Sequence, residues 1–353
     1  MHFAFTEQQL EFQSALRSVL ENECTPDHLR AAFADPSADA GRWTTLDEMG
    51  VVSLTVPEEN GGLGLGLVDL VLLLEEAGRA ALPEPLVETT AMAAPVLAAL
   101  AGRHDRCQRA LEALVGGGLK MAVSQSADPL VPVAGALGAD AVLMTVVRDG
   151  IREIHLVPTN GDGPEVARPE PVSTLDPTRL VGRFTSDPTG SATSIATGDE
   201  AERLWGDLEQ RAFVATGAFL LGLAERMITI TVDYAKDRKQ FGQPIGSFQA
   251  VKHLLAGAQV KLEFARPCVY AAAWMIDQGD PSAARNASTA KAYASEAATE
   301  AARVCLQAHG AIGYTWECDL QLYLKRSWAL AEAWGSADDH RQLVLDSLVD
   351  EFG

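Results

Sequence analysis

The stretch from residue 201 to the C-terminus is dominated by long helical patterns, and these limit the folds open to the chain. Large apolar residues recur at helical intervals at Leu208, Phe213, Phe219, Leu220, Leu223, Met227, Ile230 and Tyr234. A second pattern begins after Ser247, and a third begins with Asp280 as N-cap and Pro281 at the first helical position. A fourth and a fifth flank the stretch AEAWGSADDH at residues 331–340. Such helices must bury their apolar stripes against one another, so we expect a bundle of four or five helices.

The residues before this bundle divide into a helical part and a strand-rich part. Thr6 and Gln9 have the spacing of a capping box, and helical patterns continue to the glycines at 116–118. Short runs such as KMAVSQS, AVLMTVV, REIHLVP and RLVGRFTS follow, with Pro or Gly every ten or so residues, which is typical of strands. We therefore predict an α+β, mostly α chain. Its domains are an N-terminal helical domain (1–117), a short β domain (118–200) and a C-terminal helical bundle (201–353).

Composition narrows the classes of partner and compartment. The formal net charge of -20 would repel nucleic acid, although local basic residues could still receive an anionic ligand. The five cysteines are scattered without metal-ligand spacing, which favours unpaired thiols in a reducing compartment. We find no signal peptide and no run of the ~18 apolar residues that a membrane span needs. We therefore expect a cytoplasmic protein with no membrane span and no metal site.

The stretch DRKQFGQPIGSFQ, residues 237–249, is the first candidate for a binding site. Basic residues gather here at Lys236, Arg238 and Lys239. Cations are favourable at a helix C-terminus, so a purely structural role is one interpretation. However, Gly242, Pro244 and Gly246 predict a tight turn between two phenylalanines. A guanidinium beside an aromatic ring and a pre-bent backbone suits a pyrophosphate attached to a flat base.

The stretch QAHGAIGYTWE, residues 307–317, is the second candidate. A helix is predicted to end at His309 and Gly310, followed by a turn of small residues. Gly310 and Gly313 allow backbone conformations that side chains forbid, so the chain can come close to a ligand there. An ordinary glycine helix cap is the structural alternative.

Together the two stretches resemble the acyl-CoA dehydrogenase family. The pattern Arg-x-x-Phe-Gly-x-Pro-Ile-x-x-Phe-Gln runs from Arg238 to Gln249. The pattern Gln-x-x-Gly-Gly-x-Gly-Tyr runs from Gln307 to Tyr314, with Ala311 in place of the second glycine. FTEQQLEF and VPEENGGLG also look like the family's N-terminal domain. The resemblance covers essentially the whole chain and implies an N-terminal helical domain, a small β domain and a C-terminal four-helix bundle.

The resemblance implies an FAD enzyme of paired subunits that desaturates an acyl-CoA substrate, with electron-transfer flavoprotein as the acceptor. In such enzymes the first motif reaches the FAD pyrophosphate and adenine of a neighbouring subunit, and the second contacts the same nucleotide from the partner's side. The first set carried over to this chain is Arg238, Phe241, Phe248 and Gln249. The second set is Gln307, Gly310 and Ala311.

The family's catalytic base is absent from its usual place. It is a glutamate in a Tyr-Glu-Gly-Thr loop, which removes the α-proton of the acyl-CoA. In this chain Trp334 takes the Tyr place and Gly335 takes the Glu place. Some members carry the base on the first bundle helix, where this chain has Ala212, followed by Phe213 in place of an arginine. The displaced candidates are Glu209, Glu332, Asp338 and Asp339. The two aspartates are also explained as N-terminal charge on the last helix.

The segment that lines the flavin ring in the family also differs from the family's pattern in this chain. A Thr-Glu-Pro-x-x-Gly-Ser-Asp segment is expected in the β domain, and this chain has AVSQSADPLVPVAGALGADAVLM instead. Ser124 and Ser126 are the candidates to substitute for it. The sequence therefore retains the motifs for the nucleotide part of an FAD site, whereas the motif that lines the flavin ring is missing.

This asymmetry resembles the non-catalytic subunits of actinobacterial acyl-CoA dehydrogenases, which form α2β2 heterotetramers acting on CoA thioesters of steroid side chains. The leading hypothesis is such a subunit, paired with a second acyl-CoA dehydrogenase chain that carries the base. A second hypothesis is a self-sufficient homo-oligomer with Glu209 as relocated base. A non-enzymatic scaffold and a flavin monooxygenase on the same fold are further alternatives.

Overall fold

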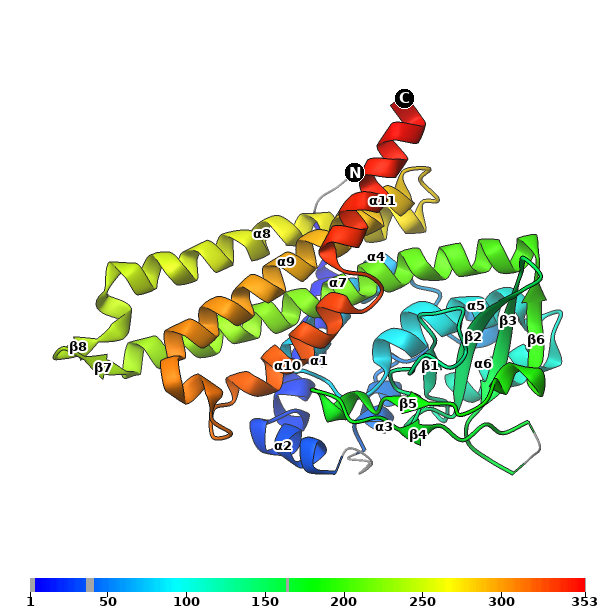
Figure 1. The fold of residues 1–353 in the computed structure, drawn as a ribbon, viewed down its shortest axis with the longest axis horizontal. Helices are drawn as coiled ribbons and strands as arrows, with labels where there is room; N and C mark the ends of the chain where they lie inside the picture. The colour runs from blue at the N-terminus through cyan, green and yellow to red at the C-terminus, as the bar shows by residue number, and fades with distance from the viewer. Residues whose placement is uncertain (1–3, 36–40, 163–164, 353) are drawn as a thin grey trace. The chain divides into compact units, whose positions relative to one another are not determined.

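The computed structural model describes residues 4–35, 41–162 and 165–352, and the chain forms two compact units (Figure 1). The first unit contains Met1–Arg30, Val71–Leu82 and Phe213–Gly353, and the second contains Ala31–Leu70 and Pro83–Ala212. Three helices, α2 (Pro26–Ala34), α4 (Leu67–Arg79) and α7 (Asp199–Asp237), contribute residues to both units.

The first unit is helical. Besides parts of α4 and α7, its helices are α1 (Glu7–Glu23), α8 (Gln249–Asp277), α9 (Ala283–His309), α10 (Leu320–Glu332) and α11 (Ala337–Phe352). The bundle forms as its sequence patterns predict, and α8 and α9 lie side by side (Figure 1). The predicted start of α9 is wrong by two residues: its N-cap is Ser282 and not Asp280, because Asp280 accepts hydrogen bonds from Ser282 in the turn before the helix. Alanines cover the buried face of α9, including Ala290, Ala294, Ala297 and Ala301, so its neighbours can pack closely. The predicted capping box at the start of α1 is present, with both hydrogen bonds between Thr6 and Gln9.

A close helix crossing in this unit brings α4 against α7. A Cβ added at Gly78 would overlap the carbonyl oxygen of Phe219, and one added at Gly222 would overlap that of Glu75. Next to this crossing the buried Glu75 carboxylate accepts hydrogen bonds from Tyr270 and from Arg266 Nε, the latter at 2.8 Å. Burial raises the pKa of Glu75, while the Arg266 guanidinium opposes that shift. The ion pair fixes α8 against α4.

The second unit combines short helices with a small sheet. Its helical segments are α3 (Arg42–Glu48), η2 (Val87–Ala93, a π-helix), α5 (Ala94–Ala101) and α6 (Asp105–Val115), and α2 (Pro26–Ala34) spans the boundary between units. The sheet has the order β1-β2-β3-β6, from β1 (Met121–Val123), β2 (Ala141–Arg148), β3 (Ile151–Pro158) and β6 (Thr193–Thr197). β1 and β2 are parallel and the other pairs antiparallel. A two-stranded pair joins β4 (Glu170–Pro171) to β5 (Gly182–Arg183). Val142, Met144, Val157 and Phe184 belong to the apolar core of this region.

The order of helices, strands and helices confirms the predicted α+β, mostly α fold class. The division by residue number into 1–117, 118–200 and 201–353 stays a prediction, since the compact units are discontinuous in sequence.

One helix of the described residues bears on the expectation that the chain has no membrane span. By length and composition α7 is apolar enough to cross a membrane, with a mean hydropathy of 1.5 over its best 18-residue window. However, 72% of that window is buried inside the structure, as in a core helix. The continuous apolar stretch of α7 is explained by packing on several sides, which a one-faced helical stripe does not predict.

The glycine crossing gives a direct test of packing. Gly222→Ala should lower the free energy of unfolding by about 3 kcal/mol, because the added methyl group forces two backbones apart. Gly206→Ala is the matched control on the same helix, since a Cβ there meets nothing within 4 Å. That control should stabilise the chain by roughly 0.5–1 kcal/mol through helix propensity. Urea unfolding followed by circular dichroism measures both, and equal effects would contradict the proposed crossing.

Candidate nucleotide site and the turn that lacks a carboxylate

The first motif forms a hairpin directly after α7. β7 (Lys239–Gln240) pairs with β8 (Gln243–Pro244), and the two-residue turn has positive φ at Phe241 (52°) and Gly242 (80°). This is the turn geometry that matches the twist of two short antiparallel strands. The Phe241 side chain is 93% exposed and its ring lies edge-on to Phe248 at 6.2 Å. An exposed, backbone-fixed phenyl ring is placed to contact a molecule outside this chain.

The cations and the start of α8 lie on the same hairpin. Arg238 and Lys239 are both exposed, and the backbone of Arg238 is fixed by hydrogen bonds to Tyr234 and Ile245. A Cβ at Gly246 would meet the Ala235 carbonyl oxygen at 3.0 Å, so a glycine lets this loop lie close to α7. Phe248 is the N-cap of α8 and no side chain caps the first turn of that helix. Basic side chains and a helix N-terminus together suit a phosphate group.

The second motif ends α9. Gly310 is the C-cap with φ 63° and ψ -141°, a backbone region that is essentially restricted to glycine. A Cβ at Gly310 would meet nothing within 4 Å, so the space beside this backbone is open. Gln307, Gly310 and Ala311 are all exposed. The glycine therefore serves as a helix cap and also leaves a free surface.

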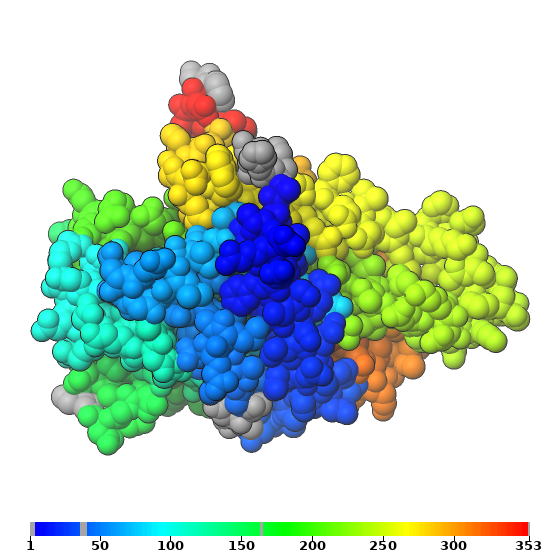
Figure 2. Space-filling model, turned by 180° about the vertical axis from the view of Figure 1, so that it is seen from behind, coloured from blue at the N-terminus to red at the C-terminus, as the bar shows by residue number. Residues whose placement is uncertain are grey.

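A ring stack brings the two motifs to the same end of the first unit. Tyr234, four residues before Arg238, stacks on His309 with centroids 4.3 Å apart and planes at 15°. His309 is buried, its Nδ1 lies 2.9 Å from the Cys305 carbonyl oxygen, and burial lowers its pKa. In Figure 1 the hairpin and the end of α9 lie at the same end of the bundle, and Figure 2 shows the yellow-green hairpin region on the surface. Exposed aromatic residues near the second motif are Tyr314 and Trp316.

This end of the bundle fits a dinucleotide. It offers two exposed cations, one of them a planar guanidinium, and exposed aromatic rings, which are groups that bind pyrophosphate and a flat base. The cations, Phe241, Gln249, Gln307 and Gly310 all lie on the exposed surface of the chain. The surface can therefore contribute one side of a nucleotide site.

The turn between α10 and α11 contains the expected position of the base. Asp339 accepts hydrogen bonds from Ser336 N at 2.9 Å and from Ser336 Oγ at 2.7 Å, which lower its pKa. Ser336 Oγ accepts from Asp339 N in return, which is the reciprocal pattern of a capping box. Asp338 is in the first turn of α11 and pairs with Arg341 at 2.6 Å. Both aspartates therefore serve the start of the helix. Glu332 is exposed at the end of α10.

Two residues that the sequence did not single out surround Gly335. Lys291 Nζ donates to the Gly335 carbonyl oxygen at 3.1 Å and to that of Ala331 at 2.9 Å. His340 Nε2 lies 2.9 Å from the Trp334 carbonyl oxygen, so Nε2 carries the proton and donates. Lys291 and His340 are both completely buried. A lysine inside the alanine stripe of the third long helix was the available sequence signal.

Glu209, the candidate for a relocated base, lies on α7 and accepts a hydrogen bond from Trp205 Nε1 at 3.1 Å. Burial raises the pKa of Glu209, which is the direction that a general base needs. On the same helix, Ala212 is completely buried and Phe213 packs edge-on against His340 at 4.5 Å. Neither residue can supply a base.

The serines proposed for the ring side are engaged locally. Ser124 Oγ donates to the Ser126 carbonyl oxygen at 2.8 Å, and Ser126 Oγ accepts from Asp128 N at 3.1 Å. Ser124 is buried at the end of β1. Both hydroxyls stabilise the turn that follows the strand.

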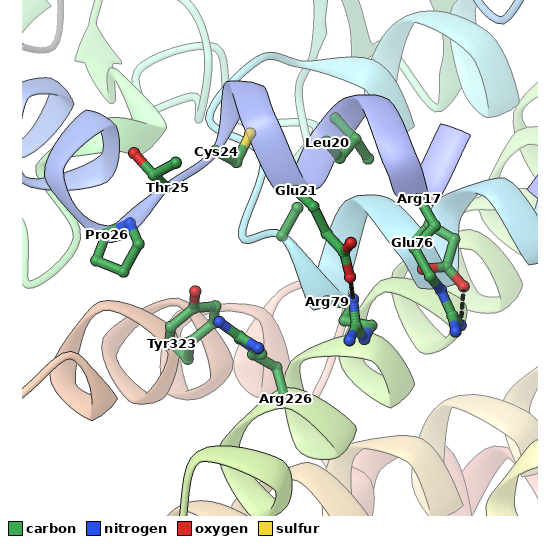
Figure 3. Close-up of a pocket in the computed structure, with 11 residues that line it drawn as sticks. Arg17, Leu20, Glu21, Cys24, Thr25, Pro26, Glu76, Arg79, Arg226 and Tyr323 are labelled. Carbon is green, nitrogen blue, oxygen red and sulfur yellow. Dashed lines mark hydrogen bonds and ion pairs between the residues drawn. The ribbon is translucent and has the colours of Figure 1, made fainter. Parts of the chain in front are cut away.

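A small cavity in the first unit is lined by charged residues (Figure 3). Its volume is about 80 Å³. Its polar lining comes from Arg17, Glu21, Thr25, Glu76, Arg79, Arg226 and Tyr323. Arg17 pairs with Glu76 at 2.6 Å and Arg79 with Glu21 at 2.9 Å, while Arg226 lies over the Tyr323 ring. The cavity holds none of the residues that the sequence motifs identify.

Comparisons with known proteins agree over most of the chain. The family model described as "Acyl-CoA dehydrogenase, N-terminal domain" matches residues 6–118, and "Acyl-CoA dehydrogenase, C-terminal domain" matches residues 210–349. The acyl-CoA dehydrogenase IpdE2 of Mycobacterium tuberculosis is 34% identical over 332 residues, which is 92% of each chain.

Two solved complexes have similar structures. The steroid ACAD Tcur3481-Tcur3483 matches with a TM-score of 0.86 at 26% identity over 98% of each chain. The ChsE4-ChsE5 complex from Mycobacterium tuberculosis matches with a TM-score of 0.85 at 25% identity over 99% of each chain.

The buried imidazole predicts acid sensitivity. Burial, then the Lys291 charge, lower the pKa of His340 from 6.5 to about 4. Between these values the unfolded chain binds a proton that the folded chain does not, so stability should fall from pH 6.5 to pH 4, by up to about 3 kcal/mol. His340→Gln, which retains an N–H donor, should remove this part of the pH dependence. His28→Gln, an exposed histidine, is the control. Thermal melts across this pH range compare them, and unchanged pH dependence in His340→Gln contradicts the prediction.

Proposed function

Because the chain belongs to the acyl-CoA dehydrogenase family, we propose that it is the subunit of a hetero-oligomeric acyl-CoA dehydrogenase that lacks the catalytic base. The family and its activity class, oxidoreductases that act on acyl-CoA, are those expected from the sequence. One observation carries the proposal: the nucleotide motifs are exposed at one end of the first unit, while the turn where the base belongs holds Trp334 and Gly335.

In this proposal the chain holds the nucleotide part of FAD across a subunit interface. Arg238 would pair with the pyrophosphate, and Phe241 and Phe248 would contact the adenine. Gln249 and the α9 end at Gln307, Gly310 and Ala311 would complete the contact. When bound, FAD supplies the acceptor for the hydride removed from the substrate. Apart from the half-buried Phe248, these residues are exposed, and their exposure supports binding between chains.

The proton is removed elsewhere in this proposal. Asp338 and Asp339 are committed to the start of α11, and no other carboxylate lies in the turn from 333 to 337. A carboxylate that is already ion-paired or capping a helix is a poor base, because both interactions stabilise its charged form. A second acyl-CoA dehydrogenase chain with an intact glutamate would then supply the base, and electron-transfer flavoprotein would accept the electrons.

The relatives support a proposal for the substrate class. Both similar structures contain paired, separately named chains, and one of the two is a steroid ACAD. We propose an acyl-CoA thioester of a steroid side chain as substrate, in the cytoplasm. The β unit keeps Ser124 and Ser126 in their own turn, which supports a ring-side pocket built mainly by the partner.

Glu209 favours a second candidate, a self-sufficient homo-oligomer. Its raised pKa suits proton abstraction, although Trp205 already donates to its carboxylate. In that case Glu209→Gln would abolish turnover while FAD remains bound, and wild-type turnover in the variant would exclude this residue.

Co-expression tests the main proposal. The chain alone should retain little FAD and show no dehydrogenase activity. Co-expressed with a relative that carries the glutamate, it should form a yellow complex with half an FAD per chain. Absorbance and protein quantification give the ratio. Strong turnover by the chain alone would contradict the proposal, and a colourless complex would favour a scaffold. Oxygen consumption that depends on reduced flavin would favour a monooxygenase.

The role of the first motif can be tested separately. Arg238→Gln should weaken FAD binding in the assembled complex about tenfold, because a charged hydrogen bond to phosphate contributes about 1.5–3 kcal/mol. Lys236→Gln is the matched control two residues away, since Lys236 already pairs with Asp233 at 2.9 Å. Flavin fluorescence after dilution measures release, and equal retention in both variants would contradict a pyrophosphate contact.

A further inference from the structure

The turn between α10 and α11 is fixed by a lysine with no exposure to solvent. Lys291 Nζ donates to Ser295 Oγ at 2.9 Å, to the Ala331 carbonyl oxygen at 2.9 Å and to the Gly335 carbonyl oxygen at 3.1 Å. An ammonium has three N–H groups, so its charged form is fully hydrogen-bonded here. Without it, these acceptors would lose a partner inside the protein, which is costly.

The first turn of α11 fixes the same segment from another element. His340 donates from Nε2 to the Trp334 carbonyl oxygen at 2.9 Å, and its ring packs edge-on against Phe213. Ser336 and Asp339 cap each other beside it. Three consecutive residues, Trp334 to Ser336, are therefore held by α9 and by α11.

The backbone of this turn decides where a side chain fits. Trp334 has φ 62°, in the left-handed region that other residues adopt at some cost. Gly335 has φ 100°, outside the small left-handed region open to residues with a Cβ. A Cβ at Gly335 would also lie 3.3 Å from His340 Nε2. Position 335 therefore requires glycine.

This requirement bears on the alignment with the Tyr-Glu-Gly-Thr loop. The sequence allows two alignments with this four-residue loop. The loop's first residue is aligned with Trp334 in one and with Ala333 in the other. With Trp334 at the Tyr place, the glutamate falls on Gly335, where the backbone excludes a side chain. With Gly335 on the loop's glycine, Ser336 falls on Thr and Trp334 on the glutamate. The second alignment agrees with the backbone.

We propose that this turn keeps the frame of a catalytic loop in which position 334, and not 335, can carry a carboxylate, and that Lys291 and His340 are its positioning residues. The inference rests on the proposed function of a subunit without a base. The base is then lost by one change of side chain, to an indole, on a turn whose hydrogen bonds are intact.

The first test compares two lysines. Lys291→Met should increase hydrogen exchange of the amides in residues 331–336 at least about tenfold, because the clamp on two carbonyls is lost. Lys252→Met, an exposed lysine on α8, should leave them unchanged. If Lys291→Met leaves residues 331–336 protected, or loosens the whole first unit equally, Lys291 is not a positioning residue of the turn.

A spectroscopic signal separates positioning from general stability. In protein labelled with 5-fluorotryptophan, the Trp334 resonance, assigned with Trp334→Phe, should shift with a midpoint near pH 8. Burial lowers the pKa of Lys291 to about 8, and neutralising it removes one of its three N–H groups. Glu332, His340 and Asp339 are the other titratable groups that face this site, and absence of the shift in Lys291→Met distinguishes their effects. A shift that persists in the variant would overturn the assignment to Lys291.

The second test places the same side chain at the two adjacent positions. Trp334→Glu should lower the melting temperature by a few degrees and keep residues 331–336 protected. Gly335→Glu should lower it by roughly 5 °C or more, because the backbone strain and the contact with His340 come together. The reverse order would overturn the alignment. None of these measurements needs flavin or a partner chain, so their failure is distinct from failure of the half-occupancy test.

Discussion

The close approach of α4 and α7 at Gly78 and Gly222 is the constraint on which the first unit depends. Backbone touches backbone there, so the two helices have little freedom to slide. The buried Glu75 carboxylate beside the crossing then takes Arg266 and Tyr270 from α8. An ion pair of this kind needs all its partners, since an unpaired buried charge is costly. The direction of α7, and thus the place where its hairpin emerges, follows from this packing.

The hairpin at the end of α7 explains why the proposed nucleotide surface is exposed. Tyr234 and His309 bind the ends of α7 and α9 to each other, so both motifs stay in place without a ligand. The aromatic and basic side chains that follow point to solvent, and their exposure is unfavourable in a chain that has no partner. A preformed, exposed surface of this type favours binding between subunits, because few side chains and loops must become ordered on association and the entropy cost is small.

Local patterns in the sequence predicted the parts that depend on local physics. The capping box at Thr6, the long helices and the glycine-dependent hairpin are set by residues within a few positions of each other. Lys291 and His340 could not be found in this way, because their roles come from carbonyl groups 40 and 6 residues away. The choice between positions 334 and 335 as the place for a carboxylate also depended on the backbone angles of Trp334 and Gly335, which the sequence does not give. The apolar window of α7 shows the same limit, since burial on several sides depends on packing.

The turn at Trp334 contains more features that lower stability than a simple connection between two helices requires. It contains a buried ammonium, a buried neutral imidazole and two consecutive residues with positive φ, one of them a tryptophan. Each such feature costs of the order of 1–3 kcal/mol unless its surroundings compensate. A Ser-x-x-Asp cap alone would end one helix and begin the next. These hydrogen bonds therefore support the proposal that the turn has the geometry of a catalytic loop, with an indole at the position proposed for the carboxylate.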